Sequence, residues 1–217
     1  MSEEEKRETN GTWITVNGSH IFIRENETLK EALTRYNVPE CKSESEGNDF
    51  KKSLINAKKT QAPEDAWRVD TDSHEGKDYI GNKIYTSKGG STVAVTKDGD
   101  IVSVCTNKTD NMYGHELLEV AVRAGGKKLD SFDGNFGFYM RNGFEPVSWC
   151  AFDKKYAPKG WKATRDKEEP IIFFKYTGKK YGKQTKDFWE LKKEKFYKKV
   201  KMSKDYDEAM KKRDKEV

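Results

Sequence analysis

Two runs of β-favouring residues lie on either side of a short polar turn near the middle of the chain. Residues 91–96 and 101–105 are rich in valine, isoleucine and threonine, and residues 97–100 between them contain an Asp-Gly pair. β-Branched side chains pack well on a pleated sheet, and Asp-Gly is typical of tight turns. The pattern therefore predicts two adjacent antiparallel strands.

Apolar residues at helical spacing predict helices before and after these strands. In residues 49–59 the apolar positions recur at intervals of four and three, which places them on one face of a helix. Residues 116–124 form a second apolar-rich run. Gly125-Gly126 follows it directly and supplies the left-handed residue that commonly ends a helix.

Shorter runs complete the expected order of elements. Strands are predicted over residues 127–132, 145–152 and 170–176, and a short helix through Tyr139 ends at an Asn142-Gly143 turn. Residues 67–69 are predicted as one more short strand, and residues 79–85 as a weak helix or an extended segment. This mixed order is typical of an α+β fold, a largely antiparallel mixed sheet with flanking helices.

The chain divides into three segments by composition. Residues 1–48 form an N-terminal arm with a polar, disordered start, a β-hairpin around Asn17-Gly18, a helix over 28–36 with Thr28 and Glu31 in capping-box spacing, and a polar linker over 42–48. Residues 49–178 form the core domain. Residues 179–217 form a basic helical tail, with helices over 187–202 and 203–216, the second beginning at Ser203 as its candidate N-cap.

Charge is distributed unevenly between these segments. Of 217 residues, 34% are hydrophobic and 36% charged, and the formal net charge is +5. Residues 178–217 carry 15 Lys and Arg against 8 Asp and Glu, a net of +7, whereas residues 1–177 carry 27 against 29, a net of −2. The tail is therefore a candidate for binding nucleic acid, and a solvated helix with salt-bridged faces is the alternative.

Other classes of protein are disfavoured by what the chain lacks. Cys41, Cys105 and Cys150 have neither zinc-knuckle spacing nor the density of a disulfide scaffold, which favours a reducing compartment. The three histidines are too scattered to suggest a metal site. No run approaches about twenty apolar residues, and the start is acidic, so we expect neither a membrane span nor a secretory signal.

The segment Phe138-Tyr139-Met140-Arg141-Asn142-Gly143-Phe144 resembles a motif of the GNAT acyltransferase superfamily, in which a helix ends and a strand begins. The order of strands and helices around it is similar to that family's. The resemblance implies a GNAT-like fold, acetyl-CoA as acyl donor and Tyr139 as the general acid that protonates the departing thiolate. The alternative is that these aromatic residues only fill the core.

The resemblance also implies a pyrophosphate-binding loop before the helix at residue 116. Of the family's glycine pattern only Gly114 is present here, with Lys108 able to supply charge and His115 beside it. These three residues are the expected donor-binding positions. His115, Glu116 and Asp100 are candidates for the general base, and Cys105 at the end of a strand is either a cleft residue or a buried thiol.

Residues 13–23 resemble a hairpin found at the ends of phage head-morphogenesis and cargo proteins, and several other runs, including residues 129–133, resemble small GNAT-like proteins of phages and mobile elements. This implies a phage-encoded protein in the host cytoplasm or the virion, with capsid proteins as possible partners of the hairpin. The expected function is acetyl transfer to a primary amine of a protein or small molecule. The alternative is a non-catalytic virion or host-interaction protein that has lost donor binding.

Overall fold

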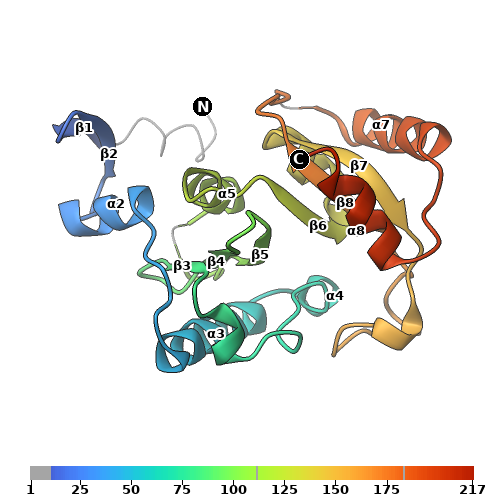
Figure 1. The fold of residues 1–217 in the computed structure, drawn as a ribbon, viewed down its shortest axis with the longest axis horizontal. Coiled ribbons are helices and arrows are strands. Elements are labelled where there is room, and N and C mark those ends of the chain that lie inside the picture. The colour runs from blue at the N-terminus through green and yellow to red at the C-terminus, as the bar shows by residue number, and fades with distance from the viewer. Residues whose placement is uncertain (1–10, 111, 183) are drawn as a thin grey trace.

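The computed structural model describes residues 11–110, 112–182 and 184–217. The polar, disordered start expected for the first residues lies almost wholly outside this part of the chain. Within it the protein is an α+β structure in which helices cover both faces of two antiparallel sheets, as Figure 1 shows. The α+β class predicted from the sequence is therefore confirmed.

Each of the two core sheets has three strands. The first has the order β3-β4-β5 and contains the two strands expected around the Asp-Gly turn; the second has the order β6-β8-β7. The strand bounds are β3 Lys83–Thr86, β4 Thr92–Val95, β5 Ile101–Cys105, β6 Lys128–Phe132, β7 Phe144–Cys150 and β8 Ile171–Tyr176.

The two sheets meet only where β5 and β6 begin. Asp100 and Lys128 form a parallel bridge, and the backbone N–H groups of Lys127 and Lys128 both donate to the carbonyl of Gly99, at 2.9 and 3.2 Å. Further along, β5 is paired with β4 and β6 with β8, and no bridge joins β5 to β6 in the described residues. The two strands therefore part beyond their first residues.

An irregularity in β5 lies on the parted side. The register between β4 and β5 shifts by one residue, and Ser103 has a φ of 56°, which is rare for a residue with a side chain. An extra residue of this kind is a β-bulge, which bends its strand and interrupts the ladder. The Ser103 hydroxyl hydrogen-bonds the hydroxyl of the buried Tyr79 at 2.9 Å, which holds the bulge in place.

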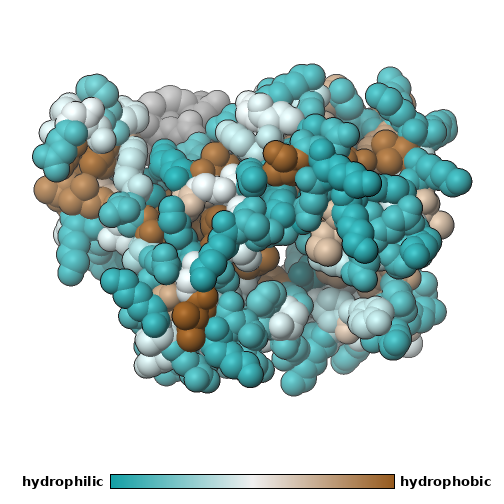
Figure 2. Space-filling model, viewed as in Figure 1, coloured by the Kyte–Doolittle hydropathy of each residue, from teal (hydrophilic) through white to brown (hydrophobic). Residues whose placement is uncertain are grey.

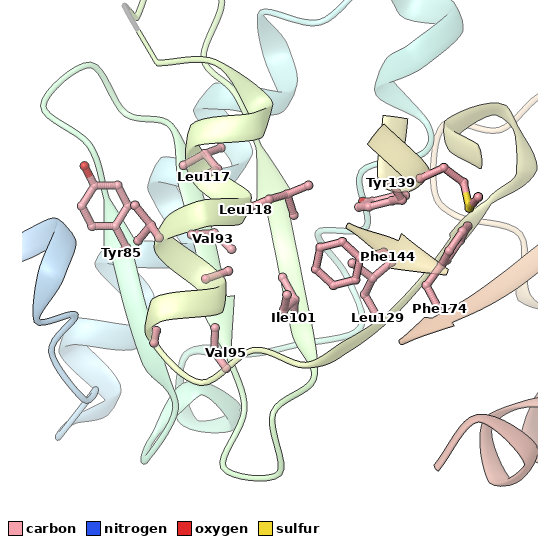
Figure 3. Packing of buried hydrophobic residues seen from close by; sticks show 14 of the residues in the cluster. Tyr85, Val93, Val95, Ile101, Leu117, Leu118, Leu129, Tyr139, Phe144 and Phe174 are labelled. Atoms are coloured by element: carbon pink, nitrogen blue, oxygen red, sulfur yellow. The ribbon is translucent and has the colours of Figure 1, made fainter. Parts of the chain in front are cut away.

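One face of the sheets carries the largest hydrophobic cluster. The helices on this face are α5 (Gly114–Arg123), α6 (Phe136–Arg141) and α7 (Lys186–Lys199). Leu117 and Leu118 of α5 pack over the first sheet, whereas Phe136 of α6 and Phe196 of α7 pack over the second. In Figure 3 Leu117 lies near Val93 and Tyr85 on one side of Ile101, and Leu129, Tyr139, Phe144 and Phe174 gather on the other.

The opposite face is covered by different elements. They are α3 (Glu44–Lys59), α4 (Pro63–Ala66), the 3-10 turn η1 (Gly76–Tyr79) and α8 (Tyr206–Asp214). Leu54 and Ala57 of α3 bury Cys105, as the apolar spacing of residues 49–59 predicts, and Ala209 of α8 packs against Phe173. Smaller clusters on this face and the large one on the other make a three-layer core.

Two local predictions on this face were wrong. The linker expected over residues 42–48 is mostly helix, because the Ser43 side chain accepts the Glu46 N–H at 3.3 Å and caps α3 five residues earlier. The strand expected over residues 67–69 is a turn that follows α4. Trp67 is 1% exposed and packs on Phe132 at 4.7 Å between ring centroids, so burial and not strand pairing accounts for this apolar run.

The N-terminal elements contact the core through α5. They are β1 (Gly11–Val16), β2 (Ser19–Arg24) and α2 (Leu29–Tyr36); β1 and β2 pair antiparallel, and α2 has the expected capping box of Thr28 and Glu31. Arg24 forms a 2.6 Å ion pair with Glu116 of α5, and Arg123 lies over the Tyr36 ring at 4.3 Å. These contacts join the arm to the helix that carries the expected donor loop.

The C-terminal helix α8 and the residues just before it pack along the second sheet. The Trp149 indole donates to the Val200 carbonyl at 2.8 Å, and the Ser148 hydroxyl to the Ala209 carbonyl at 2.6 Å. The second helix begins later than predicted, because Asp205 is its N-cap, whereas Ser203 is buried and bridges to Cys150. The segment boundary at residue 178 and a role for this segment in nucleic-acid binding stay predictions.

The outer surface is largely polar. In Figure 2 hydrophilic side chains cover most of the visible face, and the hydrophobic ones form small separate patches. Among the helices of the described residues, none combines the length and the apolar character that crossing a membrane requires.

Candidate functional site

Tyr139 is held in α6 by the turn that ends this helix. Gly143 directly after the helix has a φ of 89°, a conformation that glycine adopts without strain, and a Cβ here would lie 2.9 Å from the Tyr176 ring. The turn leads into β7, whose first residue, Phe144, is fully buried. Tyr139 packs against Phe144 and Phe174, with ring centroids 6.1 and 5.4 Å away.

The hydroxyl of Tyr139 reaches β6. Only 8% of this residue is exposed, and burial raises its pKa to about 12, although a hydrogen bond with Ser131 acts in the opposite direction. The phenol is therefore protonated throughout the physiological range. It can donate a proton, and Ser131 places it beside the strand that parts from β5.

Asp130 directly precedes Ser131 in β6 and faces the other side of this strand. Its carboxylate accepts a hydrogen bond from the Tyr206 hydroxyl of α8 at 2.9 Å. Burial, together with the nearby Asp100 carboxylate, raises the pKa of Asp130 to about 6. In the sequence Asp130 lies within residues 129–133, a run that resembles phage proteins, and its one distinguishing feature there is a carboxylate inside a predicted strand.

The three expected donor-binding residues lie in the connection between β5 and α5 and at the start of α5. Lys108 is exposed, and its backbone N–H donates to the Thr60 hydroxyl at 3.0 Å, which ties the loop to the end of α3. Gly114 is the first residue of α5, and a Cβ at this position would lie 2.9 Å from the Phe138 ring of α6. Close packing of the two helices therefore accounts for this glycine independently of any ligand.

His115 lines a half-open pocket of about 280 Å³ between α5 and the end of α6. Its ring stacks on Tyr113 with centroids 5.7 Å apart. The pocket contains two cations, an amide and a phenol beside the imidazole, and its residues are His115, Leu118, Glu119, Val122, Arg123, Asn142, Tyr176 and Lys180. Glu119 forms ion pairs with both cations, at 3.7 Å to Arg123 and 3.5 Å to Lys180.

The N-terminus of α5 already holds a carboxylate. Glu116 accepts the Tyr113 N–H at 2.7 Å and forms the 2.6 Å ion pair with Arg24. A carboxylate in the first turn of a helix is stabilised by the helix dipole, and it repels a second anion. Arg24 of the N-terminal arm offsets this negative charge. Arg24 could not be predicted from the sequence, because 92 positions separate it from Glu116.

The other residues considered as bases or nucleophiles are engaged elsewhere. Asp100 accepts two hydrogen bonds from the buried Arg213. Cys105 is 4% exposed, and burial raises the pKa of its thiol to about 12, which makes it unreactive at neutral pH. On β6 itself, Asp130 interacts with Tyr206 and Ser131 interacts with Tyr139.

Comparison of the chain with protein-family models, curated proteins and solved structures gives no significant match. The functional assignment therefore depends on the residues and on their arrangement in the structure.

Proposed function

We propose that this chain is a GNAT-like N-acyltransferase that moves an acetyl group from acetyl-CoA to a primary amine. The observation that carries the proposal is the position of Tyr139 beside β6, where this strand has parted from β5. A substrate can approach backbone and side chains between two parted strands, whereas fully paired strands leave no such opening. Two antiparallel sheets, β3-β4-β5 and β6-β8-β7, joined by one parallel bridge at the start of β5 and β6, support the proposal.

The pocket between α5 and α6 is the proposed position for the nucleotide part of the donor. Arg123 and Lys180 are cations suited to phosphate groups, which would replace Glu119 as their partner, and the Tyr176 and His115 rings are suited to a flat base. Gly114 begins the helix that carries His115, whereas Lys108 does not line this pocket and its loop is tied to the end of α3. These residue types fit a phosphate-bearing donor, which when bound supplies a thioester as the activated acyl group.

Tyr139 is the proposed proton donor to the leaving thiolate. Its phenol is protonated at neutral pH, and the surrounding aromatic rings exclude water from it. General-acid catalysis by a positioned side chain commonly contributes about 10²–10⁴-fold to a rate. Packing against Phe144 and Phe174 holds the Tyr139 ring, and its hydroxyl interacts with Ser131 of β6, where the acyl group would lie.

The test is release of free thiol from acetyl-CoA with spermidine as acceptor amine, measured for wild type and two tyrosine variants. Tyr139→Phe should lower kcat by about 10²-fold or more. Tyr156→Phe is the matched control, because Tyr156 is 73% exposed and is not one of the residues of the proposed site. This variant should keep the wild-type rate. Equal rates for all three proteins would contradict the role of Tyr139.

A second candidate function is favoured by the start of α5. Glu116 occupies the helix N-terminus that would otherwise attract a pyrophosphate, and Gly114 is explained by packing against Phe138. Both observations suit a GNAT-like protein that no longer binds a donor and acts as a non-catalytic phage virion or host-interaction protein. Its presence in purified particles, combined with no affinity for acetyl-CoA, would favour this function over the first.

A further inference from the structure

We propose that Asp130 receives the proton of the acceptor amine, that Tyr206 of α8 positions it, and that the acceptor is a cationic primary amine approaching from the α3 and α8 face. The inference rests on the proposed acyltransferase function. It adds a second reacting group to Tyr139, and it gives the C-terminal helix a part in the site.

The geometry of β6 places the two groups on opposite faces of one strand. Successive side chains of a strand point to opposite faces, so Asp130 and Ser131 do so. Tyr139 meets Ser131 on the α5 and α6 face, and Tyr206 meets Asp130 on the α8 face. The proton donor Tyr139, beside Ser131, and the proton acceptor Asp130 thus lie on opposite faces of β6. Asp130 and Ser131 are two and three residues beyond Lys128, whose bridge to Asp100 joins the two sheets.

The charges around Asp130 favour a cation. Asp100 and Arg213 both act on Asp130, and they offset each other because Arg213 donates two hydrogen bonds to Asp100. Asp70 and Asp130 itself are therefore the carboxylates that favour a cation here. The groups that interact electrostatically with Asp130 come from five surrounding elements or loops: Asp70 after α4, Asp100 before β5, Tyr139 of α6, Cys150 of β7, and Tyr206 and Arg213 of α8.

The chemistry of Asp130 suits an acceptor of protons near neutral pH. A pKa of about 6 leaves the carboxylate mostly ionised at pH 7 and still basic enough to take a proton, which is the range in which general bases work best. Tyr206 donates to Oδ1 of Asp130, so Oδ2 is the oxygen that would take the proton of the amine.

The acceptor ammonium group first loses one proton to bulk water. The neutral nitrogen then forms a bond to the acyl carbon, and the bond from that carbon to sulfur breaks. One proton leaves the nitrogen for the Asp130 carboxylate, and one proton passes from the Tyr139 phenol to the departing sulfur. Between turnovers Asp130 loses its proton to water and Tyr139 regains one, so the net products are the amide and the free thiol.

The first test is the pH dependence of thiol release from acetyl-CoA with spermidine. In wild type kcat/KM should fall below a pH near 6, because protonated Asp130 cannot accept a proton. Asp130→Asn should lower kcat by about 10²-fold or more and remove this acidic limb. Asp207→Asn is the matched control, since it removes an exposed carboxylate from α8 next to Tyr206, and it should preserve both the rate and the limb.

The second test uses Tyr206→Phe, which deletes only the hydroxyl that donates to Asp130. Loss of this hydrogen bond to the charged form should raise the pKa of Asp130 by about half to one unit. The ¹³Cγ signal of Asp130, followed by NMR against pH in protein without donor, should move accordingly, and the acidic limb should shift with it. A packing role for Tyr206 alone would change neither titration.

The outcomes separate this inference from the proposed function. Thiol release that is lost in Tyr139→Phe but unchanged in Asp130→Asn would overturn the inference and leave the acyltransferase intact. Bound acetyl-CoA that releases no thiol with spermidine or poly-L-lysine would also overturn it. Absence of acetyl-CoA binding to the wild-type protein would contradict both this inference and the proposed acyltransferase function.

Discussion

The guanidinium of Arg213 holds the carboxylate of Asp100 through two hydrogen bonds, of 3.2 and 2.7 Å, although 113 residues separate the two. Arg213 is 1% exposed and also lies over the Phe173 ring, with its central guanidinium carbon 5.6 Å from the ring centroid. The pair joins the last helix to the turn before β5, next to the only bridge between the two sheets in the described residues. It fixes α8, and with it Tyr206, relative to β6.

Removal of this cation should destabilise the fold strongly. Arg213→Ala leaves the Asp100 carboxylate buried without its partner, and breaking a buried ion pair from one side costs about 3–5 kcal/mol. Urea unfolding at pH 7 should show this loss in the free energy of unfolding. Lys211→Ala, an exposed cation of the same helix, should change it by less than about 0.5 kcal/mol. Equal effects of the two substitutions would mean that α8 is only loosely held.

Asp130→Asn should stabilise the protein at neutral pH. The folded-state pKa of Asp130, about 6, is raised above the value of about 3.9 for an unfolded chain, so ionisation favours unfolding. Asp130 therefore leaves stability unchanged below about pH 4 and reduces it as pH rises from 4 to 6. The free energy of unfolding of the variant should exceed that of wild type by about 1–3 kcal/mol at pH 7.5, with no such excess at pH 4.

Such a gain in stability combined with a loss of activity would mark Asp130 as a residue kept for function. A pH-independent difference between Asp130→Asn and wild type would show instead that the carboxyl titrates as in an unfolded chain. Urea unfolding at several pH values between 4 and 8 distinguishes these results, with Asp207→Asn as the reference for an exposed carboxylate.

Gly114→Ala tests what this glycine does. The added methyl group would lie 2.9 Å from the Phe138 ring, so α5 or α6 must shift, and such overpacking costs about 1–3 kcal/mol. Shortening the facing side chain in the double variant Gly114→Ala/Phe138→Leu should recover part of this loss, as thermal unfolding would reveal. Wild-type stability in the single variant would exclude close helix packing as the reason for glycine.

The sequence predicted the core elements well because their signals are local. The Asp-Gly turn, the glycines after α5 and α6 and the capping box at Thr28 each depend on neighbouring residues, and all appear in the structure. The residue at which α3 begins and the turn at Trp67 were not predicted, because the cap at Ser43 and the burial of Trp67 override weaker local preferences.

Most of the candidate site could not be read from the sequence. Tyr206 and Asp130 are 76 positions apart, and Arg24 and Glu116 are also distant, so no periodic pattern relates them. The net positive charge of residues 178–217 predicts a surface that binds nucleic acid. One of these cations, Arg213, is however buried and paired with Asp100. Only a folded chain shows which of these charges are neutralised and which are exposed.

The most direct test of the central claim is a calorimetric titration of the wild-type protein with acetyl-CoA, repeated with the Arg123→Ala/Lys180→Ala variant of the pocket. The account predicts saturable binding of one donor per chain, weakened in the variant because two cations that face the phosphate groups are lost. Absence of any binding heat at millimolar acetyl-CoA, with the protein folded by circular dichroism, would contradict the acyltransferase assignment.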